Sequence, residues 1–173
     1  QDTPAGTYPP RGVEAMARTR PGAERQSTHD TDFEAAPRNL DRADQAIAMA
    51  AMFLSEHIGV RAIVAITESG GTPRFLSRFR SPAQVIALSS DEAARRRMAL
   101  MRDVTALSFE SAGMSAGVAA RGAARMLFEQ GLLEEGDRII FTSGEIMHQH
   151  GATNTLRLLQ IGPGGAAEGL GEL

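Results

Sequence analysis

The residues best suited to chemistry lie in one short segment, TESGGT, at positions 67–72. The segment provides three hydroxyl groups and two glycines: Thr67, Ser69 and Thr72, with Gly70 and Gly71. Hydroxyls can hydrogen-bond to an anion, and glycines let the backbone approach it and turn sharply. Oxygen-rich, uncharged ligation of this kind suits a phosphate monoester. A capped turn without a ligand has the same composition, so the pattern alone leaves both interpretations open.

Two other polar clusters are weaker candidates. His148 and His150 alternate as ligands do in some metal sites, but the remaining histidines are distant in sequence and cysteine is absent, so a solvated loop is the better interpretation. The arginine run 95–97 lies in a helical pattern with Asp91 and Glu92, which favours a solvated helix face over a phosphate or subunit contact. We therefore predict neither a catalytic residue nor a metal site in this chain.

The composition excludes several kinds of chemistry. All 18 residues counted as Lys or Arg are arginine, and cysteine is absent. The chain therefore has no lysine for a Schiff base or a Walker-type phosphate loop, and no thiol for a disulfide or a nucleophile. The formal net charge of −3 and the lack of long single-sign runs give no reason to expect a nucleic acid or a membrane as partner. We expect a soluble, cytoplasmic protein.

The elements that position the candidate segment alternate along the chain. A long apolar helical pattern covers 39–59 and ends at Gly59. After it, helical stretches separate most of five strand patterns: 61–66, 83–88, 104–109, 137–143 and 153–161. This alternation predicts an α/β fold, a three-layer domain with a mainly parallel five-stranded sheet and helices on both faces. The last strand follows a loop too short for a crossover helix, so we expect it to be antiparallel.

The place of the candidate segment within this fold favours ligand binding. In an open α/β sheet, ligands bind beyond the carboxyl ends of the strands, where helices begin. Residues 67–72 follow the first strand and precede a helix, so they occupy such a position. The glycine-rich tail, 162–173, has too few large apolar residues to pack, and we predict that it is disordered.

Three segments together resemble the C-terminal domain of pyruvate kinases, especially the bacterial type regulated by monophosphates. They are QDTPAGTYPPRGVEAMAR (1–18), AIVAITESGGTPRFLSRFR (62–80) and GDRIIFTSGEIMHQHGATNTLRLLQI (136–161). Each motif is moderately specific, and their order and spacing are similar to those of the family. The resemblance implies 1–26 as a remnant of the last barrel loop and helix, 27–38 as a linker and 39–161 as the C-terminal-like domain.

The resemblance also implies that this chain lacks the family's catalytic groups. In the family these groups, with the ligands for magnesium and potassium, lie in an upstream (β/α)₈ barrel that transfers phosphate from phosphoenolpyruvate to ADP. We therefore expect this chain alone to be inactive and to hold no cofactor. The family's C-terminal domain helps to build the oligomer and binds a phosphorylated sugar or nucleotide monophosphate, so both roles are expected here.

The family's binding residues can be carried over by position. The phosphate loop would consist of Thr67, Glu68, Ser69, Gly70, Gly71 and Thr72, and the effector loop of Gly151, Ala152, Thr153 and Asn154. One departure matters, because the family usually has arginine where this chain has Gly71. A hydrogen bond to a charged group contributes about 1.5–3 kcal/mol, so we expect effector affinity to be roughly tenfold to a hundredfold weaker unless Arg74 or Arg78 takes that role.

Two alternatives remain open. Without a cation at position 71, the site could be vestigial and the domain could serve only in subunit assembly. The chain could also be a small independent enzyme acting on a phosphorylated metabolite, with Glu68 or Glu145 as acid or base. Loss of phosphate binding with retained self-association would support the first alternative, and turnover by the isolated chain would support the second.

Overall fold

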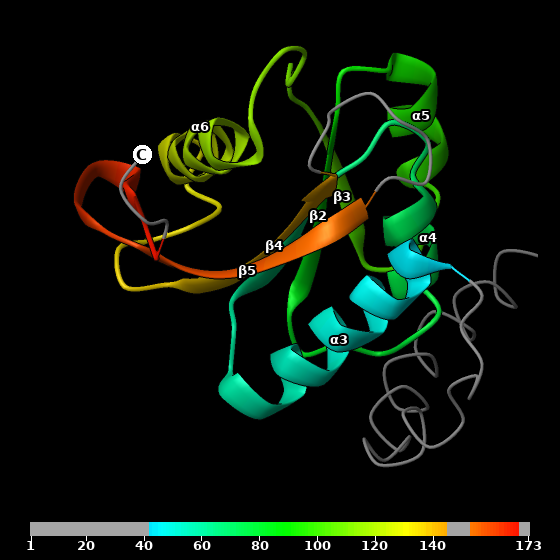
Figure 1. Ribbon diagram of the computed structural model, residues 1–173, viewed down its shortest axis with the longest axis horizontal. Helices are drawn as coiled ribbons and strands as arrows, with labels where there is room; N and C mark the ends of the chain where they lie inside the picture. The colour runs from blue at the N-terminus through cyan, green and yellow to red at the C-terminus, as the bar shows by residue number, and fades with distance from the viewer. Residues whose placement is uncertain (1–41, 145–152, 170–173) are drawn as a thin grey trace, which may run out of the picture. The chain divides into compact units, whose positions relative to one another are not determined.

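The computed structural model describes residues 42–144 and 153–169. The chain divides into two compact units, Gln1–Ala36 and Pro37–Leu173, and all described residues belong to the second unit. The predicted barrel remnant and linker, 1–38, therefore lie outside the described residues. The coloured ribbon shows the second unit, which is an α/β domain (Figure 1).

The domain is built on a six-stranded mixed sheet. Its strands are β1 (Ala62–Ile66), β2 (Gln84–Ser89), β3 (Val104–Ser108), β4 (Arg138–Gly144), β5 (Thr153–Ile161) and β6 (Ala167–Glu168). They lie in the order β3-β2-β1-β4-β5-β6, in which the first four are parallel and β5 and β6 are antiparallel to their neighbours. The predicted α/β architecture and the antiparallel fifth strand are confirmed, while the sheet has one strand more than the predicted five.

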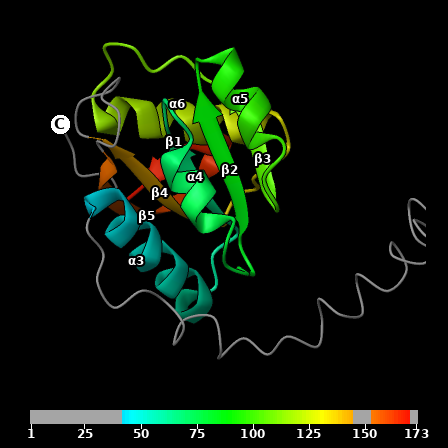
Figure 2. The same ribbon diagram turned by 90° about the vertical axis from the view of Figure 1, so that its right-hand side faces the viewer.

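Within the described residues, four α-helices cover the two faces of the sheet. They are α3 (Ala43–Ile58), α4 (Gly71–Leu76), α5 (Glu92–Met98) and α6 (Ala116–Glu129). Helices α3, α4 and α5 lie on one face and α6 lies on the other (Figure 2). Local signals set their ends, because Gly59 adopts a left-handed conformation with φ of 58° after α3, and Asp91 and Ser115 accept backbone N–H bonds at the starts of α5 and α6.

Alternation along the strands divides the apolar side chains between the two faces. Val64, Ile86 and Phe141 are fully buried in the cluster that faces α6, whose alanines let the helix approach the sheet closely. On the opposite face, Ala87 of β2 packs with Met98 of α5. Full burial of a large apolar side chain contributes about 1.5–3 kcal/mol, so this two-sided core holds the sheet and helices together.

The order of the strands reverses between β1 and β4. From β1 the chain passes through α4 to β2 and through α5 to β3, always moving in one direction along the sheet. Helix α6 then returns the chain across the other face to β4, which pairs with the free side of β1. The carboxyl ends of β1 and β4 therefore form a topological switch point, where open α/β sheets bind their ligands.

Residues 162–169 correct the prediction that the whole tail is disordered. They form a 3₁₀ turn at Pro163–Gly165 and then β6, which extends the sheet beyond β5. This turn packs closely on α6, because a Cβ added at Gly165, where φ is 78°, would lie 2.8 Å from the Cβ of Phe128. Backbone pairing and a close glycine contact fix the segment, so its low content of apolar side chains was misleading. Residues 170–173 lie outside the described part of the chain.

Candidate functional site

The loop between β1 and α4 lies at the switch point, and its own residues fix its shape. The backbone N–H of Thr67 donates to the carbonyl of Leu88 at 3.0 Å, and the Thr67 hydroxyl accepts from the N–H of Gly70 at 2.9 Å. Gly70 has φ of 80°, and a Cβ there would lie 2.9 Å from Cγ of Met98, which is fully buried. Position 70 therefore requires glycine for both its conformation and its space.

A hydrogen bond joins the two segments that the sequence analysis assigned to the effector. The hydroxyls of Thr72 and Thr153 lie 3.0 Å apart, although 81 positions separate them in the sequence. Both residues are buried, and Thr153 begins β5 opposite Gly144 at an irregularity in the β4–β5 pairing. Asn154 is the next residue of β5 and is exposed. The structure thus brings the start of α4 and part of the predicted effector segment together, whereas the other two predicted effector residues lie outside the described chain: Gly151 and Ala152.

Exposure divides the hydroxyls of the loop into two kinds. Thr67 and Thr72 are buried with 8% and 3% of their surface exposed, and both already take part in hydrogen bonds. Ser69 is exposed, and Glu68 beside it is half-buried. Ser69 is therefore the loop hydroxyl that a ligand can reach from solvent in this conformation, while the two threonines hold the loop in shape.

Gly71 faces a carboxylate that the sequence analysis did not single out. A Cβ added at Gly71 would lie 3.5 Å from Oδ2 of Asp44, which is an ordinary contact. Asp44 is buried in the first turn of α3, and Arg42 binds both of its oxygens, with Nη2 at 2.7 Å and Nε at 3.0 Å. The backbone N–H of Gln45 donates to the same carboxylate at 3.0 Å. Acidic residues are common in first helical turns, so nothing in the sequence distinguished Asp44.

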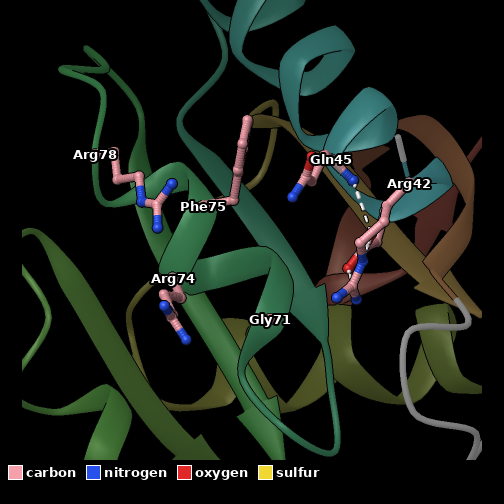
Figure 3. Close-up of a pocket in the computed structure, with 7 residues that line it drawn as sticks. Arg42, Gln45, Gly71, Arg74, Phe75 and Arg78 are labelled. Carbon is pink, nitrogen blue, oxygen red and sulfur yellow. Dashed lines mark hydrogen bonds and ion pairs between the residues drawn. The ribbon is translucent and has the colours of Figure 1, made fainter. Parts of the chain in front are cut away.

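Arg74 and Arg78, the predicted substitutes for the missing cation, line a groove between α3 and α4 (Figure 3). We call it the α3–α4 groove. It encloses about 160 Å³ and is lined by Arg42, Asp44, Gln45, Gly71, Arg74, Phe75 and Arg78. Thr72 contacts β5, whereas Arg74 and Arg78 line this groove together with Gly71. The two arginines are therefore near the loop, but their side chains line the α3–α4 groove.

The arginines of α5 differ in their contacts. The Arg95 guanidinium donates to the carbonyl oxygens of Ser89 and Ser90 at 2.8 and 2.7 Å, so it caps the end of β2. Arg96 pairs with Glu92 one turn earlier, at 2.6 Å, and both side chains are exposed. The interpretation of the run as a solvated helix face therefore fits the exposed Arg96 and Arg97, whereas half-buried Arg95 is bound to the end of β2.

Two further hydroxyls are buried near the carboxyl end of β4. Thr142 and Ser143 have no exposed surface, and their hydroxyl oxygens have no hydrogen-bond partner among the residues that the structure describes. They contrast with Thr72 and Thr153, whose hydroxyls satisfy each other. Nothing in the sequence distinguished the pair, because a Thr-Ser dipeptide at the end of a strand is ordinary turn material.

The remaining candidates of the sequence analysis, Glu145, His148 and His150, lie outside the described residues. In the part of the chain that is described, no group of three or more His, Asp or Glu side chains is placed to hold a metal ion. None of the helices described is long and apolar enough to span a bilayer.

The fold and the switch-point loop resemble those of known proteins. The family model for the pyruvate kinase alpha/beta domain matches residues 45–159, which cover β1 to β4, their helices and most of β5. The chain belongs to this family. Pyruvate kinase II of Salmonella typhimurium is 39% identical over 161 residues, which are 92% of this chain and 33% of the relative. Pyruvate kinase of Buchnera aphidicola subsp. Baizongia pistaciae is 35% identical over 163 residues, again 92% of this chain and 33% of the relative.

A solved structure supports the same fold. The crystal structure of a pyruvate kinase from Cryptosporidium parvum superposes with a TM-score of 0.69 at 23% identity, over 90% of this chain and 30% of that one. The chain spans about a third of the length of the curated relatives it matches. The catalytic barrel of a pyruvate kinase is therefore absent from this chain.

Proposed function

We propose that this chain is the regulatory and subunit-assembly domain of a pyruvate kinase, and that it binds the phosphate group of a small effector at residues 67–72. The observation that carries the proposal is the hydrogen bond between Thr72 and Thr153, because it links the loop that would hold the phosphate to the predicted effector segment. The whole protein would be a cytoplasmic homo-oligomer that transfers phosphate from phosphoenolpyruvate to ADP in glycolysis, through groups outside this chain.

The effector would regulate the protein through different affinities for two arrangements of the domain. A phosphate held at Ser69 would lie beside the start of α4, and its effect would pass through Thr72 to Thr153 and so to β5. Strand β5 pairs with β4 and β6, and contacts α3, so its start is connected to several elements. Coupling between two sites is typically worth about 1–3 kcal/mol, which changes affinity roughly 5- to 150-fold.

The donors of the loop predict a modest affinity. No side chain in 67–72 carries a positive charge, and Gly71 stands where the family usually has arginine. Neutral hydrogen bonds contribute about 0.5–1.5 kcal/mol each, compared with about 1.5–3 kcal/mol for bonds to charged groups. We therefore expect weaker effector binding than an arginine-containing loop would give.

Calorimetry on the whole chain tests this proposal. The ligands are ribose 5-phosphate, AMP, glucose 6-phosphate and fructose 1,6-bisphosphate, and the variant is Ser69→Ala, which removes the exposed loop hydroxyl. Ser108→Ala is the matched control, because Ser108 is an exposed serine outside the loop, at the end of β3. Saturable binding that Ser69→Ala weakens and Ser108→Ala preserves supports the effector site. Absence of binding for all four ligands contradicts it.

The missing cation at Gly71 favours one second candidate, a domain that serves in assembly alone. Sedimentation velocity distinguishes the two, because an assembly domain self-associates to the same extent with and without phosphorylated ligands. An effector domain shifts between association states when its ligand is added. Phosphoryl transfer or hydrolysis by this chain, measured with the same ligands, would instead support the enzymatic alternative that uses Glu68.

A further inference from the structure

The α3–α4 groove has a chemistry that the switch-point loop lacks. Among the described residues, three arginines and one aspartate line it, so these charged side chains give its wall a net charge of +2. Asp44 is bound through both oxygens by Arg42, which leaves Arg74 and Arg78 as the cations of the groove without a paired carboxylate among the described residues. Neither Arg74 nor Arg78 forms an ion pair with the residues that the structure describes. The groove therefore attracts anions.

The positions of the two free arginines suit a shared ligand. Arg74 lies in α4 and Arg78 lies in the turn that follows Leu76, and both side chains line the groove. The guanidinium of Arg78 lies 6.0 Å from the centre of the Phe75 ring, which forms part of the same wall. A cation over an aromatic face is held without losing its hydrogen-bond donors, so Arg78 keeps its donors for a ligand. Planar guanidinium groups match the geometry of phosphate oxygens.

The size of the groove limits what it can hold. Pockets for drug-sized ligands enclose about 300–1,000 Å³, whereas this groove encloses about 160 Å³. A whole nucleotide is too large for it. A single phosphate group with a few carbon atoms fits this scale, so the expected ligand is a small phosphorylated metabolite.

Gly71 keeps the groove open. It is one of the lining residues, and a Cβ added there would point to Asp44, which lies on the opposite wall. A long side chain at position 71 would start inside the groove and occupy its volume. The glycine that removes a cation from the loop thus provides space beside Arg74 and Arg78.

We propose that the α3–α4 groove binds the phosphate group of a small metabolite through Arg74 and Arg78, at a site separate from the 67–72 loop. The donors of this site differ from those of the proposed effector loop, because Gly71 is the one loop residue among the lining residues described and none of the loop hydroxyls lines the groove. Gly71 borders both, so a ligand in the groove would lie next to the start of α4.

The test is calorimetric titration of the whole chain with inorganic phosphate at low ionic strength, where charged contacts are least screened. The variant Arg74→Gln, Arg78→Gln removes both free cations. Loss of charge-assisted hydrogen bonds is expected to weaken phosphate binding at least about tenfold. The matched control is Arg96→Gln, Arg97→Gln, which removes the same charge from exposed positions on α5 and is expected to change affinity less than about twofold.

A second variant tests the shape of the groove with all charges in place. Gly71→Leu fills the space beside Asp44 and should weaken phosphate binding at least about tenfold, while Gly71→Ala should have a smaller effect. Circular dichroism checks that each variant is folded. Equal affinity of Gly71→Leu and the wild type overturns the proposal.

The loop variant Ser69→Ala separates this site from the effector loop. Phosphate binding that survives Ser69→Ala but not Arg74→Gln, Arg78→Gln supports the groove, whatever happens at the loop. Binding with the opposite pattern supports the loop and overturns the groove. The groove proposal also fails if both variants abolish binding, if the α5 control weakens binding equally, or if the wild type shows no saturable binding at millimolar phosphate.

Discussion

Thr72 and Arg74 stand two residues apart on α4, yet they belong to different environments. Thr72 is buried and bonded to Thr153, whereas Arg74 is exposed and lines the α3–α4 groove. The threonine side is uncharged, and its hydroxyls are used to hold the loop and β5 together. On the arginine side, Arg74 and Arg78 carry positive charge and form no ion pair with the described residues. One side of this short helix therefore provides the positive charge that attracts an anion, and the other provides the hydrogen bonds that fix the loop.

The largest expected effect is a loss of stability when Gly70 of the loop is replaced. Gly70→Ala places a Cβ in a left-handed conformation and 2.9 Å from Cγ of buried Met98, so we expect a loss of about 2–5 kcal/mol in the free energy of unfolding. Urea denaturation measures it. The control is Gly113→Ala, because Gly113 also has a positive φ, 71°, but no atom within 4 Å of its Cβ position.

The control should lose only the conformational part, about 1–2 kcal/mol. Equal losses for Gly70→Ala and Gly113→Ala would mean that Met98 yields to the added methyl group. In that case the contact with α5 would not fix the shape of the loop.

The next effect concerns the hydroxyl pair that joins the loop to β5. Thr72→Val keeps the shape of the side chain but leaves the buried Thr153 hydroxyl without its partner, and we expect a loss of about 1–3 kcal/mol in stability. Thr142→Val is the matched control, because the Thr142 hydroxyl is buried without a partner among the described residues and its removal should be neutral or slightly stabilising. Urea denaturation of both variants measures the difference.

A double-mutant cycle sharpens this prediction. Thr72→Val with Thr153→Val removes both partners, so it should cost less than the sum of the two single variants. Additive losses would contradict a direct bond between the two hydroxyls. They would also remove the observation that links the phosphate loop to the effector segment.

The sequence predicted the turn at 67–72, which depends on local pattern, but not the α3–α4 groove, which depends on the packing of two helices. The turn between β1 and α4 was predicted because glycines and hydroxyls between a strand and a helix have a direct conformational meaning, which the left-handed Gly70 illustrates. Phosphate binding by this turn stays a prediction. The groove was not identified, because Asp44 lies 27 positions before Gly71 and only the packing of α3 on α4 brings them together. The sequence named Arg74 and Arg78 as possible replacements for the missing cation, but it did not indicate the groove that they line.

The distinction between local pattern and packing also explains which strands of the fold were predicted. Alternating strands and helices have strong periodic signals, and all five predicted strands are present. Strand β6 was missed because it is two residues long and is held by pairing with β5 and by the contact of Gly165 with Phe128. Such backbone contacts have no hydrophobic period to detect.

A smaller effect is expected at the border of the two sides, at Asp44. Asp44→Asn removes a negative charge from the groove and releases Arg42, so phosphate binding by the groove should become about two- to fivefold tighter. Asp103→Asn is the control, because Asp103 is an exposed aspartate beside Arg102 and away from the groove. Calorimetry with inorganic phosphate compares the two. Weaker binding by Asp44→Asn would show that Asp44 positions the groove rather than opposing the anion.

The smallest effect is expected at Asp91, a carboxylate that contacts neither the loop nor the groove. Asp91 caps α5, and the N–H groups of Ala94 and Ala93 lower the pKa of its carboxyl below the ordinary 3.8, with smaller contributions from Arg97 and Arg95. A lowered pKa means that the charged form stabilises the fold, so the contribution is complete above the unfolded pKa and is lost as pH falls through the folded one.

Asp91→Asn keeps the shape of the cap and removes its charge. The wild type should therefore be slightly more stable than Asp91→Asn near neutral pH, and the difference should disappear as the pH falls through the lowered pKa of the Asp91 carboxyl, because the protonated carboxyl resembles the amide. Urea denaturation over this pH range measures it. If the stability difference between the wild type and Asp91→Asn persists in acid, Asp91 acts through the geometry of its hydrogen bonds and not through its charge. The effect of Asp44→Asn on phosphate binding could then be interpreted without a general contribution from capping carboxylates.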